Sequence, residues 1–232
     1  MSRVVRRNSS RPVFSATAIQ ISGTRTPSRS KQTRSITSSV KMHNIARKRL
    51  EQYAGTVHNM EMDRIPIDPF EYLPEIMERL QKPGLLLSSG QQGNLMTIGW
   101  GTVGIVWKRP VFTVLVRPSR FSFELLRKNG NFSVCVPDTS SAHARAVAWC
   151  GTNSGRDGDK YKATGLTAQK GIINSIPYVK EFPIHYECRP LHVNHVLDAE
   201  IDGVIREQSY PEGNFHQIWW GEILGCWKKP EE

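Results

Sequence analysis

Most hydrophobic residues in this chain either alternate with polar residues or form short, continuous apolar runs. Both patterns are typical of β-strands, whose successive side chains point to opposite faces. Residues 132–136 show the alternation clearly, because Phe132, Val134 and Val136 share one face. The same criteria predict strands at residues 85–89, 95–101, 111–117, 132–136, 184–189, 191–197, 199–207 and 216–226.

Three other segments carry the three- and four-residue spacing of an amphipathic helix. The first covers residues 68–80, where Asp68 is suited to the N-cap and Pro69 to the first turn. The other two are residues 119–129, closed by Gly130, and residues 140–149, which we expect to end at Gly151.

The order of these elements predicts a mainly β fold. The strands follow one another without a helix between every pair, which argues against a doubly wound parallel sheet. Six or seven strands with two or three helices at the side favour a closed or nearly closed antiparallel barrel.

The charge is concentrated at the N-terminus. The chain has a formal net charge of +10, yet residues 1–50 hold twelve Lys and Arg residues and no acidic residue. Residues 51–232 hold 19 basic and 21 acidic residues, a net charge of −2. The expected globular part is therefore nearly neutral, and nucleic acid is not an expected partner. No apolar stretch approaches the roughly 18–20 residues of a membrane-spanning helix.

Residues 1–41 are rich in Arg and Ser and contain no acidic residue. This composition is typical of an organelle transit peptide and favours the mitochondrion, with the cytoplasm or another organelle as alternatives. A basic extension without a targeting role, an upstream stretch translated only in the gene model, and a nucleic-acid-binding arm remain open. We divide the chain into this extension, a linker with the first helix at residues 42–83, and a barrel at residues 84–232.

The four cysteines are widely spaced and contain no CxxC pair. In a chain of this length, that spacing favours buried free thiols in a reducing compartment over a disulfide framework. The cysteines are Cys135, Cys150, Cys188 and Cys226.

Three short motifs resemble known sites but lack the required context. Residues 99–104 match GxGxxG, yet a proline and a further strand follow where a dinucleotide site needs a helix. His192 and His195 lie three residues apart in a predicted strand, so they point to opposite faces and cannot share a metal ion. Asp157 and Asp159 resemble a calcium loop without its later acidic ligand. We expect no metal site.

The segment from Arg117 to Ser122 is the most informative part of the sequence. A strand ends there, two arginines flank Pro118, and a helix is expected to begin at Ser119. Unpaired N–H groups at a helix start, together with guanidinium groups and hydroxyls, suit a phosphate monoester. A second polar and basic loop covers residues 151–160. The two loops together predict one flat ligand that carries a phosphate.

Several sequence blocks, in order, are similar to one family. They are residues 94–101, 107–114, 116–122, 150–157, 159–160, 165–167, 213–216 and 221–223. The chain resembles the flavin reductase-like, FMN-binding split-barrel proteins of the flavoredoxin type over about residues 68–227. The resemblance implies a six-stranded antiparallel split β-barrel, a homodimer, and one FMN per subunit near the dimer interface.

The resemblance also implies the residues of the cofactor site. Asn94, Met96, Thr97 and Ile98 would border the isoalloxazine ring, and Arg117, Ser119, Arg120 and Ser122 would hold the ribityl phosphate. Ser154, Gly155 and Lys160 would close the site, and His216 would lie near the ring. The adjacent Trp219 and Trp220 depart from the family pattern, because less bulk is expected there.

The expected activity is hydride transfer from NAD(P)H to flavin and onward to an unknown small-molecule or protein acceptor. Because the flavin performs this chemistry, we nominate no catalytic side chain. The alternatives are a flavin-bound electron carrier reduced by a protein partner, and a non-enzymatic FMN-binding module. Salt-sensitive nucleic-acid binding through residues 1–41 is a fourth hypothesis.

Overall fold

The computed structural model describes residues 63–230. The expected N-terminal extension and most of the expected linker therefore lie outside the described residues. In the part of the chain that the structure describes, no helix is both long and apolar enough to cross a membrane.

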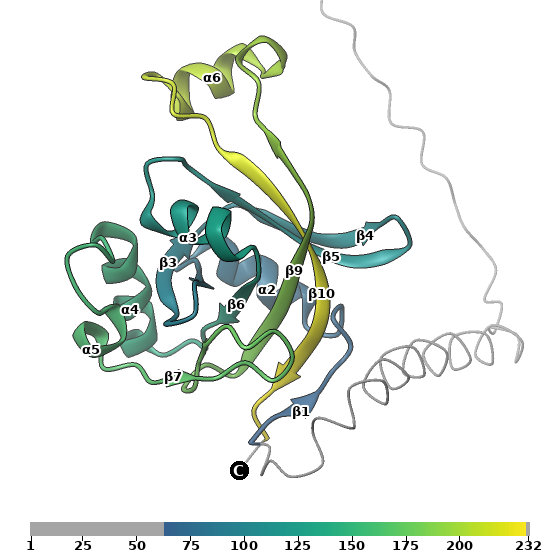
Figure 1. Ribbon diagram of the computed structural model, residues 1–232, viewed down its shortest axis with the longest axis vertical. Coiled ribbons are helices and arrows are strands. Elements are labelled where there is room, and N and C mark those ends of the chain that lie inside the picture. The colour runs from purple at the N-terminus through teal and green to yellow at the C-terminus, as the bar shows by residue number, and fades with distance from the viewer. Residues whose placement is uncertain (1–62, 231–232) are drawn as a thin grey trace, which may run out of the picture. The chain divides into compact units, whose positions relative to one another are not determined.

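An antiparallel sheet forms the body of the protein (Figure 1). Its strands are hydrogen-bonded in the order β3-β2-β6-β9-β10-β5-β4, and the short strand β1 pairs with β10. Two further short strands, β7 and β8, pair separately. The bounds are β1 Ile65–Pro66, β2 Leu85–Ser89, β3 Asn94–Ile98, β4 Gly101–Val106, β5 Arg109–Val116, β6 Phe132–Val136, β7 Ala168–Gln169, β8 Tyr178–Val179, β9 Ile184–His195 and β10 Gln217–Lys228.

The expected mainly β, antiparallel split barrel is confirmed. Its two end strands, β3 and β4, are consecutive in the chain and are joined through Gly99 and Trp100. A Cβ atom at Gly101 would lie 2.6 Å from the backbone oxygen of Thr113, so only glycine fits at this junction. The path has seven strands, compared with the six expected, and Ile65 and Pro66 of β1 add an eighth beside the end of β10.

The three predicted helices are present with shifted ends, and α5 and α6 are helices that the sequence analysis did not predict. The helix expected at residues 68–80 begins five residues later, because Asp68 accepts a hydrogen bond from Phe70 N at 2.9 Å and forms a local turn instead of a cap. The helix expected to end at Gly151 continues to Thr152. The bounds are α2 Leu73–Gln81, α3 Phe121–Asn129, α4 Ser141–Thr152, α5 Lys160–Thr164 and α6 Gly203–Ser209, with a 3₁₀ turn at Asp198–Glu200.

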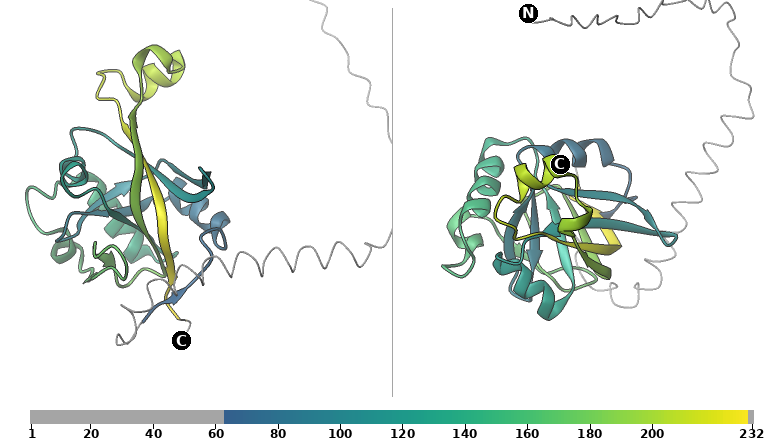
Figure 2. Two further views of the ribbon diagram at one scale, coloured as in Figure 1. Left: turned by 45° about the vertical axis from the view of Figure 1, so that its right-hand side comes forward. Right: turned by 90° about the horizontal axis from the view of Figure 1, so that it is seen from above.

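The strand predicted at residues 199–207 is wrong. The 3₁₀ turn and α6 occupy this segment, because the Asp202 carboxylate accepts hydrogen bonds from Val204 N and Ile205 N and starts the helix. Residues 196–216 form an arm that β9 and β10 carry beyond the barrel (Figures 1 and 2). The backbone bond from Val196 N to His216 O, 3.0 Å long, joins the two ends of the arm.

The two strands expected at residues 184–189 and 191–197 are one continuous strand, β9. Pro190 pairs with Gly221 and His192 pairs with Trp220, so Leu191 is left over as a bulge. The bulge absorbs the proline, which cannot donate to the ladder, without ending the strand.

Apolar side chains from both the sheet and the helices fill the interior. One cluster lies within the curled sheet and includes Leu87, Phe112, Val134 and Tyr186. A second cluster packs α4 and α5 against the outer face of the sheet. The four cysteines are buried and free, as expected.

Candidate flavin site

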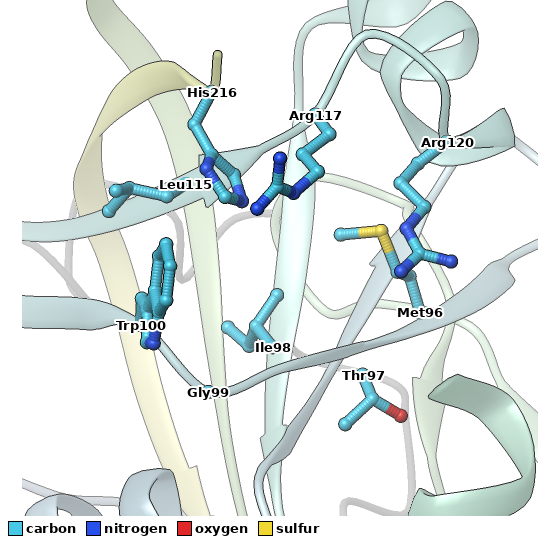
Figure 3. A pocket seen from close by; sticks show the side chains of 9 residues that line it. All are labelled: Met96, Thr97, Ile98, Gly99, Trp100, Leu115, Arg117, Arg120 and His216. Atoms are coloured by element: carbon cyan, nitrogen blue, oxygen red, sulfur yellow. The ribbon is translucent and has the colours of Figure 1, made fainter. Parts of the chain in front are cut away.

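Two adjoining hollows open where β3, β5 and the start of α3 meet. The first, which we call the aromatic hollow, has a volume of about 190 Å³ and is drawn in Figure 3. The second, the polar hollow, has a volume of about 150 Å³. They share Met96 and Arg120 in their walls, and together they reach the lower end of the roughly 300–1,000 Å³ typical of small-molecule sites.

All twelve residues expected at the cofactor line one of these two hollows. The aromatic hollow is lined by Met96, Thr97, Ile98, Arg117, Arg120 and His216, and by Gly99, Trp100 and Leu115. The polar hollow is lined by Asn94, Met96, Ser119, Arg120, Ser122, Ser154, Gly155 and Lys160, and by Phe121, Cys150, Thr152, Asn153 and Arg156.

Strand alternation divides the residues of β3 between the hollow and the helices. Met96 and Ile98 are buried on the same face, whereas Thr97 points the other way and its hydroxyl donates to the backbone oxygen of Val147 on α4. Figure 3 shows the Met96 side chain between Arg117 and Arg120, with Thr97 turned away from them. Thr97 therefore attaches β3 to α4 and has no free hydroxyl hydrogen for a ligand.

The two arginines of the segment differ in what they contact. Arg117 is half-buried and donates to the backbone oxygens of Asn214 at 3.0 Å and Ser209 at 2.7 Å, and its guanidinium carbon lies 4.9 Å from the centre of the Tyr210 ring. Arg120 is exposed, and its guanidinium has no hydrogen bond or ion pair with the described residues. Arg117 therefore holds the arm, whereas Arg120 is available to a ligand.

Helix α3 begins two residues later than the sequence suggests. Ser119 was the expected start, but Arg120 occupies the N-cap position, where no side chain caps the helix. The Ser119 hydroxyl instead accepts a hydrogen bond from Asn214 Nδ2 at 2.9 Å. The first N–H groups of α3 thus lack a side-chain acceptor at the wall of the polar hollow, which suits an anion.

The wall opposite α3 comes from the loop after α4. A Cβ atom at Gly155 would lie 1.8 Å from Asn94 Oδ1, so the loop approaches β3 as closely as a glycine allows. Asn94 Nδ2 donates to Ser122 Oγ at 2.7 Å, which leaves the serine hydrogen free to donate into the hollow. Ser154 Oγ accepts from Arg156 N at 3.2 Å.

Lys160, the first residue of α5, forms part of the wall of the polar hollow. It is buried, and its ammonium donates to the backbone oxygen of Cys150 at 2.8 Å. Burial lowers the pKa of Lys160, and nearby Arg120 lowers it further. Lys160 therefore anchors α5 to the end of α4 and adds positive charge behind the polar hollow.

His216 forms a polar part of the aromatic hollow. Burial, with Arg117 and Arg120 nearby, lowers its pKa to about 4, so the imidazole is neutral at pH 7. Its Nδ1 lies 2.8 Å from the Tyr210 hydroxyl, with which it shares a hydrogen bond. The Tyr210 hydroxyl therefore fixes the orientation of the imidazole, and Nε2 is the ring nitrogen left to contact a ligand.

The sequence did not single out the aromatic side chain that faces His216. Trp100 is 45% exposed, and its ring centre lies 5.0 Å from that of His216. A large aromatic residue between two glycines, Gly99 and Gly101, was the sequence signal that could have identified it. Asn153 and Arg156 lie in the loop already described as polar and basic, but were not assigned individually.

The two tryptophans that depart from the family pattern do not line either hollow. Trp219 is buried in the core, and Trp220 donates from Nε1 to Asn194 Oδ1 at 2.7 Å. Their bulk therefore does not obstruct the site. His192 packs against Trp107 and His195 bonds to Gln217, and the described residues contain no cluster of three or more metal-binding side chains.

Comparison with known proteins identifies the family of this chain. Residues 77–232 match the family described as flavin reductase like domain. The uncharacterized protein YddH of Escherichia coli is 29% identical over 115 residues, which cover 47% of this chain and 59% of that protein. An uncharacterized protein of Archaeoglobus fulgidus is 29% identical over 105 residues, or 45% of this chain and 58% of that protein. The matches thus span less than two thirds of either relative.

A solved structure shares the fold, and a second one aligns less closely. Nitrilotriacetate monooxygenase component B from Bacillus cereus aligns with a TM-score of 0.50 at 16% identity, covering 70% of this chain and 80% of that one. Flavoredoxin from Methanosarcina acetivorans aligns with a TM-score of 0.49 at 22% identity, covering 73% and 72%. With the family match spanning two thirds of its length, the chain belongs to the flavin reductase-like family of FMN-binding split-barrel proteins.

Proposed function

We propose that this protein binds FMN and acts as an oxidoreductase, passing hydride from NADH or NADPH to the flavin and reducing equivalents onward to an acceptor. One observation carries the proposal: the twelve residues expected from the family pattern, from five separate segments of the chain, all line the two adjoining hollows. The polar hollow offers donors for a phosphate, and the aromatic hollow offers apolar walls for a flat ring.

The polar hollow fits a phosphate monoester in three respects. The start of α3 has no side-chain cap, Arg120 has no partner among the described residues, and the hydroxyl of Ser122 keeps a hydrogen to donate. Each of these is a positive or hydrogen-donating group that an anion would satisfy. The glycine at 155 brings the loop backbone close to this position.

The aromatic hollow fits the ring of a flavin. Met96, Ile98 and Leu115 supply apolar contact, and Trp100 forms one side. The positive field of Arg117 and Arg120 favours a ligand with hydrogen-bond acceptors or negative charge, and Nε2 of His216 offers a further polar contact. These groups can position a flavin and compensate the charge that it gains on reduction.

The bound flavin supplies the capacity to accept and return hydride, so the protein need not provide a nucleophile. The protein's own contribution is orientation and charge. Arg117 holds the arm, the arm positions Tyr210, and the Tyr210 hydroxyl orients the imidazole of His216. This chain of contacts fixes the wall against which a reductant or acceptor would bind.

We also propose that the protein is a homodimer and that residues 1–41 direct it to the mitochondrion. Apolar side chains on the arm support the first proposal, because Leu197, Val204 and Ile205 are each at least half exposed. The acid-free, Arg- and Ser-rich composition supports the second. Gel filtration tests the dimer, and fluorescent fusions with and without residues 1–41 test the destination.

A visible spectrum of the purified protein, taken before and after NADH or NADPH is added without oxygen, tests the main proposal. We expect flavin absorption that either nucleotide bleaches. Flavin that only a protein donor can reduce would replace the proposal with an electron carrier. A colourless protein that binds no added FMN would contradict it altogether.

A further inference from the structure

One side chain joins the two walls of the polar hollow. Arg156 lies in the loop between α4 and α5 and lines the hollow together with Ser119 and Phe121 from the opposite wall. Its guanidinium donates to the carboxylate of Glu124 on α3 and to the backbone oxygen of Ser119 at 3.5 Å. The guanidinium carbon also lies 5.3 Å from the centre of the Phe121 ring. Arg156 therefore spans from the loop to α3.

The backbone of the loop is held in place on its own side of the hollow. Arg156 N donates to Ser154 Oγ at 3.2 Å, which fixes the turn that carries the arginine. A Cβ atom at Gly155 would lie 1.8 Å from Asn94 Oδ1 and 3.1 Å from Phe121 Cδ1, so the loop packs closely against β3 and the start of α3. The Arg156 side chain thus begins at a fixed point within reach of Glu124.

The contact made by Arg156 can open without unfolding the barrel. Among the described residues, both side-chain hydrogen bonds from residues 153–157 to Ser119 or α3 come from this arginine. Ser122, which we expect at the phosphate, is buried, whereas Arg156 and Glu124 are exposed, so the ion pair lies on the solvent side of the hollow. Exposed ion pairs are individually weak, and this one can break and form again while the protein stays folded.

We propose that the Arg156–Glu124 ion pair acts as a clasp that retains a phosphate-bearing flavin and sets the rate at which it leaves. This inference rests on the proposed function, which puts the flavin phosphate in the polar hollow. A phosphate held between the loop and α3 leaves past the ion pair, and it leaves faster when the two walls are not joined. The clasp therefore favours a flavin that stays bound as a cofactor.

Release of FMN from the full-length protein tests the clasp. The FMN-loaded protein is diluted, and the fluorescence of free flavin gives the dissociation rate constant. We expect Arg156→Ala to release FMN about three- to tenfold faster than wild type, because substitutions at a binding site act mostly on dissociation. Glu124→Gln, which removes the other half of the ion pair, should release FMN about two- to fivefold faster.

Glu124→Gln also separates a clasp from a direct contact between Arg156 and the phosphate. If Arg156 bound the phosphate itself, loss of the Glu124 carboxylate would free the guanidinium for that contact and remove a repulsive charge. FMN would then leave Glu124→Gln at the wild-type rate or more slowly, and this result would overturn the clasp.

Exchange of the two charges gives a second check that does not depend on the loss of a side chain. Arg156→Glu alone places two carboxylates opposite each other and should release FMN faster than Arg156→Ala does. Arg156→Glu combined with Glu124→Arg restores an ion pair, and we expect its release rate to return to within about threefold of wild type. A double variant as fast as Arg156→Glu alone would overturn the clasp.

Two controls distinguish the clasp from a general loosening of the site. Arg127→Ala removes an exposed positive charge from the same helix outside both hollows, and it should change FMN release by less than about twofold. Riboflavin lacks the phosphate, so Arg156→Ala should change its release by less than about twofold as well. Equal acceleration of FMN and riboflavin would mean that Arg156 only supports the fold of the site.

The outcomes separate this inference from the proposed function. If FMN binds but Arg156→Ala releases it at the wild-type rate, the clasp is wrong and the proposed function stands. If the protein binds no FMN, the proposed function fails and the clasp fails with it. Faster release in both Arg156→Ala and Glu124→Gln, recovery in the charge-exchanged variant and unchanged controls support the clasp.

Discussion

The aromatic and polar hollows share two wall residues but differ in how their polar groups are occupied. Around the aromatic hollow, Arg117 bonds to two backbone oxygens of the arm and the Tyr210 hydroxyl bonds to His216. Around the polar hollow, the start of α3 is uncapped and Arg120 has no partner among the described residues. Satisfied groups fix the shape of a wall, whereas unsatisfied ones remain available to bind a ligand.

Arg117 and Arg120 show why residue type alone does not reveal this difference. They lie three positions apart at the end of β5, and the sequence assigns both to a phosphate. The structure gives Arg117 a role in holding the arm that the sequence did not suggest, because its acceptors, Ser209 and Asn214, lie more than 90 residues away in the chain. Substitutions and pH changes around the two hollows test this difference in four ways.

The largest effect is expected from filling the narrowest point of the polar hollow. Gly155→Val puts side-chain atoms where a Cβ alone would lie 1.8 Å from Asn94 Oδ1, so the loop or β3 must move. Such overpacking costs about 1–3 kcal/mol, and we expect FMN affinity to fall by at least tenfold. Fluorescence titration measures it, with Gly104→Val as the matched control in open space. Unchanged affinity in Gly155→Val would show that FMN does not depend on this wall.

Removal of Arg120 should mainly affect FMN affinity, whereas removal of Arg117 should mainly affect stability. Arg120→Ala is expected to weaken FMN by about tenfold, because a charge-assisted contact to the phosphate is lost, while stability changes by less than about 0.5 kcal/mol. Arg117→Ala is expected to lower the free energy of unfolding by about 1–3 kcal/mol, because backbone acceptors in the arm lose their donor. Thermal unfolding and FMN titration of both variants test this expectation. If the two variants lost FMN affinity and stability to the same extent, the two arginines would not differ in role.

The neutral state of His216 predicts a pH dependence of stability. Its pKa in the folded protein, about 4, is below the usual 6.5. Between these values the unfolded chain binds more protons, so stability is lost as the pH falls from about 6.5 towards 4. The share from His216 between pH 7 and 4.5 is about 2 kcal/mol.

Chemical unfolding of wild type and His216→Gln at both pH values isolates this share. Burial also lowers the pKa of His185, and this group contributes in the same direction in both proteins. The informative quantity is therefore the difference between wild type and variant in how much the free energy of unfolding changes with pH. If the free energy of unfolding changed with pH by the same amount in both proteins, His216 would not be held neutral by its surroundings.

The smallest effect is expected at the exposed side of the aromatic hollow. Trp100→Leu should weaken FMN by about three- to tenfold, the typical contribution of one aromatic contact, with little change in unfolding temperature. Trp107→Leu is the matched control, since Trp107 is also exposed, at 62%, but lies outside both hollows. Equal losses in the two variants would indicate a general effect of surface tryptophan.

Much of the barrel could be predicted from local pattern. The bounds of β2 and β6 agree with the prediction because both strands are short and fully buried, with clear ends. Residues 199–207 could not be assigned correctly, because the capping by Asp202 outweighed an ambiguous spacing of apolar residues. The strand at 184–195 was divided at Pro190, since nothing local indicates that a bulge opposite β10 will absorb the proline.

The residue types of the site, their order and the mainly β class could be read from the sequence alone, because these depend on local pattern and on similarity to a family. Tertiary structure decided which groups remain available to a ligand. Arg117 and Thr97 acquire partners from distant segments, whereas Arg120 and the start of α3 do not. The physical reason is that a donor is satisfied only by an acceptor within about 3 Å, and which acceptors come that close depends on how the folded strands, loops and arm pack together.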